Sequence, residues 1–350
     1  PESLARAFAY RSYFNMGAIG DIFELLGMPR DSLELLLGLS TGTERPSFKP
    51  SAKTMRLLPR LLRLALHKAG YGETVGREVG LLRRAYSKFE AADLSSRSDS
   101  ALLSDIAALS ELGVRSAYAN IVTPLLANLY HSLLRRRLAK AGLDPEAVHI
   151  GDTGELVDFN PNLRLERLRA ETQRLTPVEI EAVRNDGVSG LPGPIREPLD
   201  DFIERFGHLS ASGNDFSVPS WRETPEVVLE LVLDHSSLHG ETERVAWSQA
   251  ESRLGKLSRP LARALRQRAR QFIAHREKVS FTYTYGYGLF RRYFLEIGRR
   301  LALRGVLRRP DDVMYLYMEE IRPALLGLPC RFVPEELVVE RRAEIDSVRD

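Results

Sequence analysis

The clearest pattern of hydrophobic and polar positions lies between His275 and Arg304, where aromatic residues recur every three or four positions. The spacing i, i+4, i+7, i+11 places four aromatic rings on one face of an α-helix. These rings belong to Tyr283, Tyr287, Phe290 and Phe294. Arg276 and Ser280 precede them on the same face, so the helix has a polar end and an aromatic body. Four arginines fall largely elsewhere and indicate a solvated face: Arg291, Arg292, Arg299 and Arg300.

Helical periodicity extends over most of the remaining chain. Thr176-Pro177-Val178-Glu179 combines a cap, a proline at the first helical position and a glutamate at the third, which is a capping box. Thr224-Pro225-Glu226 repeats the cap and proline. Strands are expected only near Arg11–Asn15 and at Asp312–Tyr317. Among the expected helices are 74–92, 99–112, 115–142, 241–254, 258–279, 281–304 and 318–326, with a last one from Pro334.

These elements predict a mostly α fold, an irregular multi-helix domain with long antiparallel helices and one or two short strands. We expect residues 1–350 to form a single helical domain with subdomains at 1–150 and 151–350. The chain starts Pro-Glu without Met and ends on a charged run. Both ends predict a piece excised from a longer multidomain chain.

Composition narrows the function classes only slightly. With 28% charged residues and a formal net charge of +3, the chain has little non-specific attraction for nucleic acid, and we expect no such partner. The Arg-rich segments 135–137 and 259–270 lack aromatic interleaving, so they indicate solvated helix faces. The single cysteine, Cys330, excludes a disulfide framework and suits a reducing, cytoplasmic location. No apolar run approaches the roughly 18 residues that span a membrane, so no membrane partner is expected.

The segment 206–221 (FGHLSASGNDFSVPSW) concentrates short polar side chains between helices. Such a loop can present hydrogen-bond donors and a carboxylate to a ligand. The alternative is an ordinary turn, because Asn and Asp are turn formers and Ser217-Val218-Pro219 is a helix-entry device. The side chains concerned are His208, Ser210, Ser212, Asn214 and Asp215.

Two further groups of residues suggest ligands. The run His275-Arg276-Glu277-Lys278 offers a guanidinium fork and a mobile ammonium to an anion, although a solvated basic face explains it equally. His235 and His239 have the i, i+4 spacing of a helical metal pair, but no third ligand follows, and no metal site is expected. Neither a phosphate-binding GxxxxGK[ST] loop nor a GxSxG elbow occurs, so the residues give no complete catalytic set.

Three blocks occur in the order of a known family. They are FGHLSASGNDFSVPSWRETP at 206–225, the long-helix segment at 275–307, and RRPDDVMYLYMEEI at 308–321. They resemble the middle helical domain of phosphotransferases of the phosphoenolpyruvate synthase-like class, above all the rifampin phosphotransferases. The opening RSYFNMG at 11–17, which contains Asn15, is similar to the start of that domain.

The resemblance implies an enzyme in which an ATP-grasp domain binds ATP and Mg and a swivelling domain carries a phosphohistidine. The middle domain would hold a small-molecule hydroxyl or enolate acceptor. This chain would hold no cofactor itself, and isolated from those partner domains it would be inactive. The implied catalytic residues are Arg276, for phosphate stabilisation, with Asp215 and His208 to orient the acceptor or take its proton. The implied substrate-binding residues are Lys278, Ser280, Tyr283, Tyr287, Phe290, Asn214, Ser212 and Asn15.

At two positions the chain departs from the family pattern. Leu209 stands where the family loop commonly has Arg, and Ser280 stands where the rifampin enzymes have Lys. If Arg276 meets the phosphate, we expect Asp215 to face it across one cavity. Otherwise Arg276 pairs with a carboxylate such as Glu277 or Glu251. The function alternative is a non-catalytic helical module that binds an apolar ligand or a protein partner.

Overall fold

The computed structural model of the chain describes two N-terminal strands and most of the chain from residue 70 onward. The strands are β1 (Ala5–Phe8) and β2 (Arg11–Phe14). They pair antiparallel, with Ala5 opposite Phe14. A strand near Arg11–Asn15 is therefore confirmed in β2. The later described stretches are 70–144, 156–211, 215–234, 246–330 and 332–349, with Val148 and the isolated positions 17, 20, 21, 24, 55, 56, 59 and 63.

The described residues after the strands are mostly helical, as predicted. They form two compact units, one of 1–74 with 336–350 and one of 75–335. The predicted subdomain boundary at residue 150 falls inside the second unit. The helices are α4 (Tyr71–Glu90), α5 (Asp99–Lys140), α6 (Pro161–Thr172), α7 (Pro177–Asp186), η2 (Gly187–Gly190), α8 (Gly193–Phe206), α9 (Pro225–Leu233), α10 (Trp247–Ser252), α11 (Arg259–Leu303), η3 (Pro310–Tyr315), α12 (Met318–Leu326) and α13 (Pro334–Arg349).

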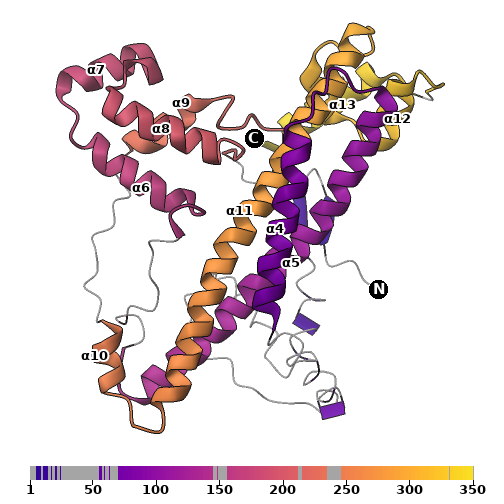
Figure 1. The fold of residues 1–350 in the computed structure, drawn as a ribbon. Coiled ribbons are helices and arrows are strands. Elements are labelled where there is room, and N and C mark those ends of the chain that lie inside the picture. Colours follow the sequence, from indigo (N-terminus) through magenta and orange to yellow (C-terminus); the bar gives the residue numbers. More distant parts are fainter. Residues whose placement is uncertain are drawn as a thin grey trace. The chain divides into compact units, whose positions relative to one another are not determined.

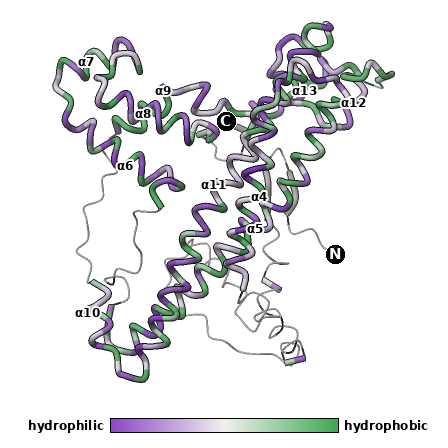
Figure 2. Tube along the Cα trace, in the orientation of Figure 1, coloured by the Kyte–Doolittle hydropathy of each residue, from purple (hydrophilic) through white to green (hydrophobic). Residues whose placement is uncertain are grey.

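The long helices α5 and α11 pack against each other in opposite directions (Figure 1). Arg300 near the end of α11 pairs with Asp99 at the start of α5, with 2.8 Å between Nη1 and Oδ1. At the other end, Phe272 of α11 stacks on Tyr130 of α5 with ring centroids 5.2 Å apart. The contacts between end and start confirm the expected antiparallel arrangement of long helices. Hydrophobic and hydrophilic positions alternate along both (Figure 2).

Both long helices are continuous. α5 covers the two ranges 99–112 and 115–142 that we expected to be separate helices. It runs through Gly113 and Pro124 without interruption. α11 covers the expected ranges 258–279 and 281–304, for which the sequence pattern also allowed one continuous helix. Packing of one long helix along the other supplies the stabilisation that intrinsic propensity alone lacks at Gly and Pro.

Helices α6 to α9 share a hydrophobic core of their own. Phe202 and Phe206 of α8 are fully buried in it, and Trp221 stacks on Phe202 at 5.8 Å. Thr176 begins α7 with the predicted capping box, in which its hydroxyl and the Glu179 carboxylate bond to each other's backbone N–H groups. Thr224 does not cap α9, because its hydroxyl donates to the carbonyl oxygen of Ser220 instead.

The strand expected at Asp312–Tyr317 is wrong, because the segment forms the 3-10 helix η3. Pro310 stands in its first turn, and the Asp312 carboxylate accepts a hydrogen bond from the Arg309 N–H at 3.0 Å. Proline and a capping carboxylate favour a helical turn here, although the residues that follow are β-prone. Gly298 of α11 lets η3 approach, since a Cβ there would lie 2.0 Å from the Pro310 carbonyl oxygen.

Candidate functional site

The aromatic face of α11 is covered by one ring from the polar segment 206–221. The Phe216 ring lies 5.8 Å from Tyr287, 5.6 Å from Phe290 and 5.4 Å from Phe294. Tyr283 continues the row, with its ring 5.5 Å from that of Tyr287. The row of four rings predicted on one face is thus confirmed. Phe290 and Phe294 are buried beneath Phe216, while Tyr283 and Tyr287 stay partly exposed.

Arg291 anchors the same segment from the neighbouring face of α11. Its Nε donates to both carboxylate oxygens of Glu223, at 2.8 and 2.7 Å. Its Nη1 donates to the backbone carbonyl oxygens of Phe216 and Ser217, and its Nη2 lies 3.4 Å from Asp311 Oδ1. Arg291 is only 7% exposed, so its expected place on a solvated face is wrong. A guanidinium needs this many acceptors when it leaves water.

The segment 206–221 folds back on itself through its backbone. Ser210 and Ser220 form an antiparallel bridge, and the Trp221 N–H donates to the Leu209 carbonyl oxygen at 2.7 Å. At the tip, Asp215 Oδ1 accepts from both the N–H and the hydroxyl of Ser217, at 2.9 and 2.6 Å. Part of the segment is therefore the ordinary turn that we weighed against a ligand site. The Asp215 side chain is solvent-exposed.

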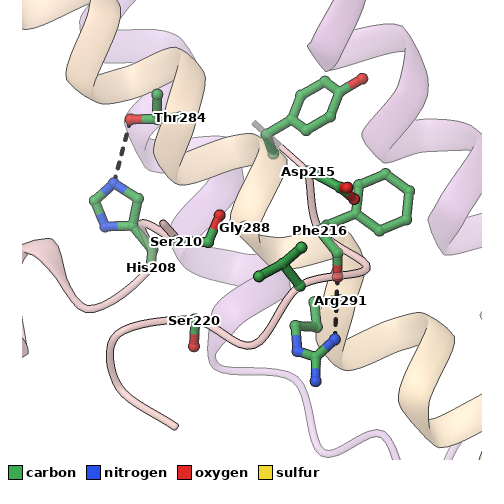
Figure 3. Close-up of a pocket in the computed structure, with 10 residues that line it drawn as sticks. His208, Ser210, Asp215, Phe216, Ser220, Thr284, Gly288 and Arg291 are labelled. Carbon is green, nitrogen blue, oxygen red and sulfur yellow. Dashed lines mark hydrogen bonds between the residues drawn. The ribbon is translucent and has the colours of Figure 1, made fainter. Parts of the chain in front are cut away.

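A small cavity of about 20 Å³, open to solvent, lies between this segment and α11 (Figure 3). One wall carries polar groups of the segment, and the other wall is the part of α11 from Thr284 to Arg291. A cavity of this size holds about one water molecule. Its polar groups beside an apolar wall are the combination that lines small-molecule sites. The lining residues are His208, Ser210, Asp215, Phe216, Val218, Ser220, Thr284, Tyr287, Gly288 and Arg291.

His208 is a neutral imidazole in this wall. Its Nε2 lies 3.3 Å from Thr284 Oγ1, which itself lies 3.1 Å from the carbonyl oxygens of Ser280 and Phe281. Because the hydroxyl proton serves those carbonyls, Oγ1 accepts from Nε2, and the ring proton is assigned to Nε2. Burial, and then the Arg222 guanidinium, lower the pKa of His208 from 6.5 to about 3. Such a ring orients a neighbour but is a weak base at neutral pH.

The backbone of His208 approaches α11 at Gly288. A Cβ at that position would lie 2.9 Å from the His208 carbonyl oxygen and 3.0 Å from its Cβ. Two residues earlier, a Cβ at Gly286 would lie 2.3 Å from Cζ of Tyr86 on α4. The two glycines in the YGYG run therefore admit the loop on one side of α11 and α4 on another.

Arg276 lies outside the cavity. It is twelve residues before Gly288 on α11, which corresponds to about 18 Å along the helix axis. Its Nε and Nη2 both donate to Glu277 Oε1, at 2.9 and 2.7 Å. Glu277 is buried, and its Oε2 accepts from Asn160 Nδ2 at 3.1 Å. The expectation that Asp215 and Arg276 face each other across one cavity is thus wrong, and the alternative pairing with Glu277 is present.

Comparison with known proteins matches the middle of the chain. Residues 117–277 match the model of the rifampicin phosphotransferase fourth domain. Rifampicin phosphotransferase of Streptomyces sviceus is 23% identical over 176 residues, covering 45% of this chain and 20% of that protein. Rifampicin phosphotransferase of a Streptomyces sp. is 25% identical over 186 residues, covering 47% of this chain and 21% of that protein.

This chain contains a rifampicin phosphotransferase-like helical domain. The matched segments span about a fifth of the length of those two relatives. The matched range of the rifampicin phosphotransferase-like domain includes His208, Asp215 and Arg276. It ends before the aromatic row and before Arg291.

The structure brings together only some of the predicted site residues. His208, Asp215 and Tyr287 line the cavity. Lys278 Nζ lies 5.5 Å from the Phe159 ring centroid, well before the cavity along α11, and Ser280 is partly exposed one turn after Arg276. Leu209, which replaces the family arginine, packs against the core of α6 to α9. The predicted residues Asn15, Ser212 and Asn214, and the pair His235 and His239, lie outside the described residues.

The cavity residues that the sequence pattern did not single out as site residues are Phe216, Val218, Ser220, Thr284, Gly288 and Arg291. The glycine spacing of the YGYG run is the one signal that could have indicated a close approach at Gly288. Within the described ranges, no three His, Cys, Asp or Glu side chains gather as a metal site would require. No described helix is long and apolar enough to cross a bilayer.

Proposed function

We propose that this rifampicin phosphotransferase-like domain binds the acceptor of an ATP-dependent phosphotransferase that works through a phosphohistidine. Its partners would be the ATP-grasp and phosphohistidine domains of the same enzyme. The acceptor would be a small molecule with a hydroxyl or enolate group. ATP and Mg would bind to the nucleotide domain.

The observation that carries the proposal is the cavity between segment 206–221 and α11. It joins an exposed carboxylate, Asp215, to the partly exposed ring of Tyr287. Asp215 Oδ1 is occupied by Ser217, which leaves Oδ2 to accept a hydrogen bond from an acceptor hydroxyl. The polar end of a ligand would meet Asp215, and its apolar body would lie along Tyr287 and Tyr283.

Arg276 would stabilise the transferred phosphoryl group at the other end of this surface. Two of its donors are held by Glu277, and the rest of its half-exposed guanidinium is available to an anion. Tyr287 follows eleven residues later, about 16 Å along the helix. Groups this far apart cannot act on one reacting atom, because transfer requires contact at about 3 Å. Asp215 therefore orients the acceptor and does not take its proton.

A binding experiment on the chain tests the acceptor role. Hydroxyl-bearing apolar compounds are titrated calorimetrically, with rifampicin among them because the matched relatives carry its name. We expect to find a ligand that binds about tenfold more weakly to Asp215→Asn and to Tyr287→Ala. A tenfold change corresponds to about 1.4 kcal/mol, which is the loss of about one good contact. Tyr118→Ala on α5 is the control and should leave the affinity unchanged. A ligand that responds only to Tyr118→Ala would contradict the proposal.

One observation favours the alternative of a non-catalytic module for an apolar or protein partner. α5 exposes a row of large apolar side chains at helical spacing, and such rows mark interaction surfaces. Val114 is 72% exposed and Ile121 is 64% exposed. A partner bound through this row would be lost in Ile121→Asp without any change at the cavity. The row consists of Val114, Tyr118, Ile121, Leu125, Leu129 and Leu133.

A further inference from the structure

Three cations from three helices surround one aromatic ring. The Arg205 guanidinium carbon lies 5.5 Å from the Phe159 ring centroid, Lys278 Nζ lies 5.5 Å away, and the Arg83 guanidinium carbon lies 6.0 Å away. Arg83 is on α4, Arg205 on α8 and Lys278 on α11. Because each charge lies within 6.0 Å of the Phe159 ring centroid, any two of them lie within twice that distance of each other. The sequence separates them by more than 70 residues each, so only the fold assembles them.

These cations have no carboxylate partners among the residues that the structure describes. Arg205 Nε donates to the backbone carbonyl oxygen of Asp158, and its guanidinium carbon also lies 5.8 Å from the Phe281 ring centroid. Arg83 and Lys278 face the Phe159 ring. Nearby carboxylates are engaged elsewhere. Arg164 pairs with Asp158 and Asp201, and Arg276 pairs with Glu277.

The local balance of charge is positive. The cations are the three that face the ring together with Arg164 and Arg276, and the carboxylates are Asp158, Asp201 and Glu277. Five cations against three carboxylates leave an excess of two positive charges. Like charges repel each other, and in physiological salt the repulsion decays over a Debye length of roughly 8 Å. A cation over an aromatic face recovers only about 0.5–1 kcal/mol at an exposed site. A bound dianion would neutralise the excess.

We propose that Arg83, Arg205 and Lys278 form a binding site for a phosphoryl dianion beside Phe159. Two guanidinium forks and one ammonium are the donor types that phosphate oxygens prefer. Arg205 and Lys278 are partly buried, which weakens screening by salt. The ring restrains all three side chains, so less rotamer freedom is lost on binding. The site does not depend on the acceptor role proposed above, because it requires only anion binding.

Calorimetric titration of the chain with inorganic phosphate, at constant ionic strength in chloride, tests this site. Arg83→Gln is the test variant, because Arg83 is exposed and makes no hydrogen bond or ion pair among the described residues. Arg84→Gln is the matched control, with the same charge change on the next residue of α4. We expect saturable binding that weakens about tenfold in Arg83→Gln, the loss of one charge-assisted hydrogen bond, and stays unchanged in Arg84→Gln.

Equal weakening in both variants, or no saturable binding by the unaltered chain, would overturn the proposal. Lys278→Gln provides a second test on a different helix and should also weaken binding about tenfold. Phenyl phosphate identifies the source of the phosphoryl group. Tighter binding than inorganic phosphate would support a site for a phosphorylated organic molecule, and equal binding would support a site for the phosphoryl group alone. In both cases the affinity should depend on Arg83.

Discussion

Arg291 on α11 holds Glu223, two residues beyond segment 206–221, because its Nε donates to both carboxylate oxygens at 2.8 and 2.7 Å. The same guanidinium binds the carbonyl oxygens of Phe216 and Ser217 within the segment. One side chain thus ties the wall of the cavity to the helix that carries the aromatic row. Since these acceptors occupy its nitrogens, Arg291 supports the site and is not a free anion-binding group.

Replacement of Arg291 by methionine should destabilise the chain while retaining most of its volume. We expect a loss of about 1–3 kcal/mol in the free energy of unfolding, because the carbonyl oxygens of Phe216 and Ser217 and the partly exposed Glu223 carboxylate lose their donor. Arg299→Gln is the control, since the Arg299 side chain is exposed where it pairs with Glu296 on the same helix, and its loss should cost less than that of Arg291. Urea unfolding followed by circular dichroism measures both. Equal losses in the two variants would show that Arg291 is not an anchor.

Gly288→Ala should also destabilise the chain, by about 1–3 kcal/mol, since the added methyl meets the His208 backbone. Gly80→Ala is the opposite case, because the added Cβ on α4 meets nothing within 4 Å. Alanine is a better helix former than glycine, so Gly80→Ala should raise stability by about 1 kcal/mol. Thermal unfolding of the pair compares them directly. Stabilisation by Gly288→Ala would contradict the close approach of segment 206–221.

The depressed pKa of His208 predicts a loss of stability in acid. In the unfolded chain this histidine protonates near its ordinary pKa of 6.5, whereas in the folded chain it protonates at about 3. The unfolded state therefore binds more protons between these values, so the contribution is fully present above pH 6.5 and is lost as pH falls toward 3. The slope is about 1.4 kcal/mol per pH unit.

His208→Gln should flatten the pH dependence of unfolding free energy in this window. The His208 ring resonances, assigned by their absence in the variant, should show no titration above pH 5 in nuclear magnetic resonance spectra. A His208 pKa near 6.5 would disprove the buried neutral imidazole.

The sequence pattern predicted the helices better than it predicted the site. The helical spacing of the four aromatic residues places them on one face of α11, and this face is the one that packs against other apolar groups. These residues are Tyr283, Tyr287, Phe290 and Phe294. Arg291 is the same residue type as the exposed Arg299 on the same helix, and only the fold shows that it faces Glu223. These contacts join residues 68 positions apart, a separation that no local spacing reveals.

The roles of individual site residues depend on distance along α11. Arg276 and Tyr287 are on one predicted face, which the sequence could indicate. That Asp215 meets this face near Tyr287, and not near Arg276, depends on how segment 206–221 crosses the helix. Gly288 and Arg291 determine where the segment crosses α11, because Gly288 approaches His208 and Arg291 binds the Phe216 carbonyl oxygen. Both contacts are to residues outside α11.

The most direct test of the acceptor role is a single-turnover measurement on the full-length protein that carries this segment. ATP loads the phosphohistidine, and transfer of the phosphoryl group to an acceptor found by titration is then followed. Arg276→Ala should slow transfer by about two to three powers of ten, the usual cost of a charge-stabilising donor, and leave histidine loading unchanged. Arg268→Ala, also on α11, is the control and should change neither step. An unchanged transfer rate in Arg276→Ala, or a protein that forms no phosphohistidine, would contradict the proposed function.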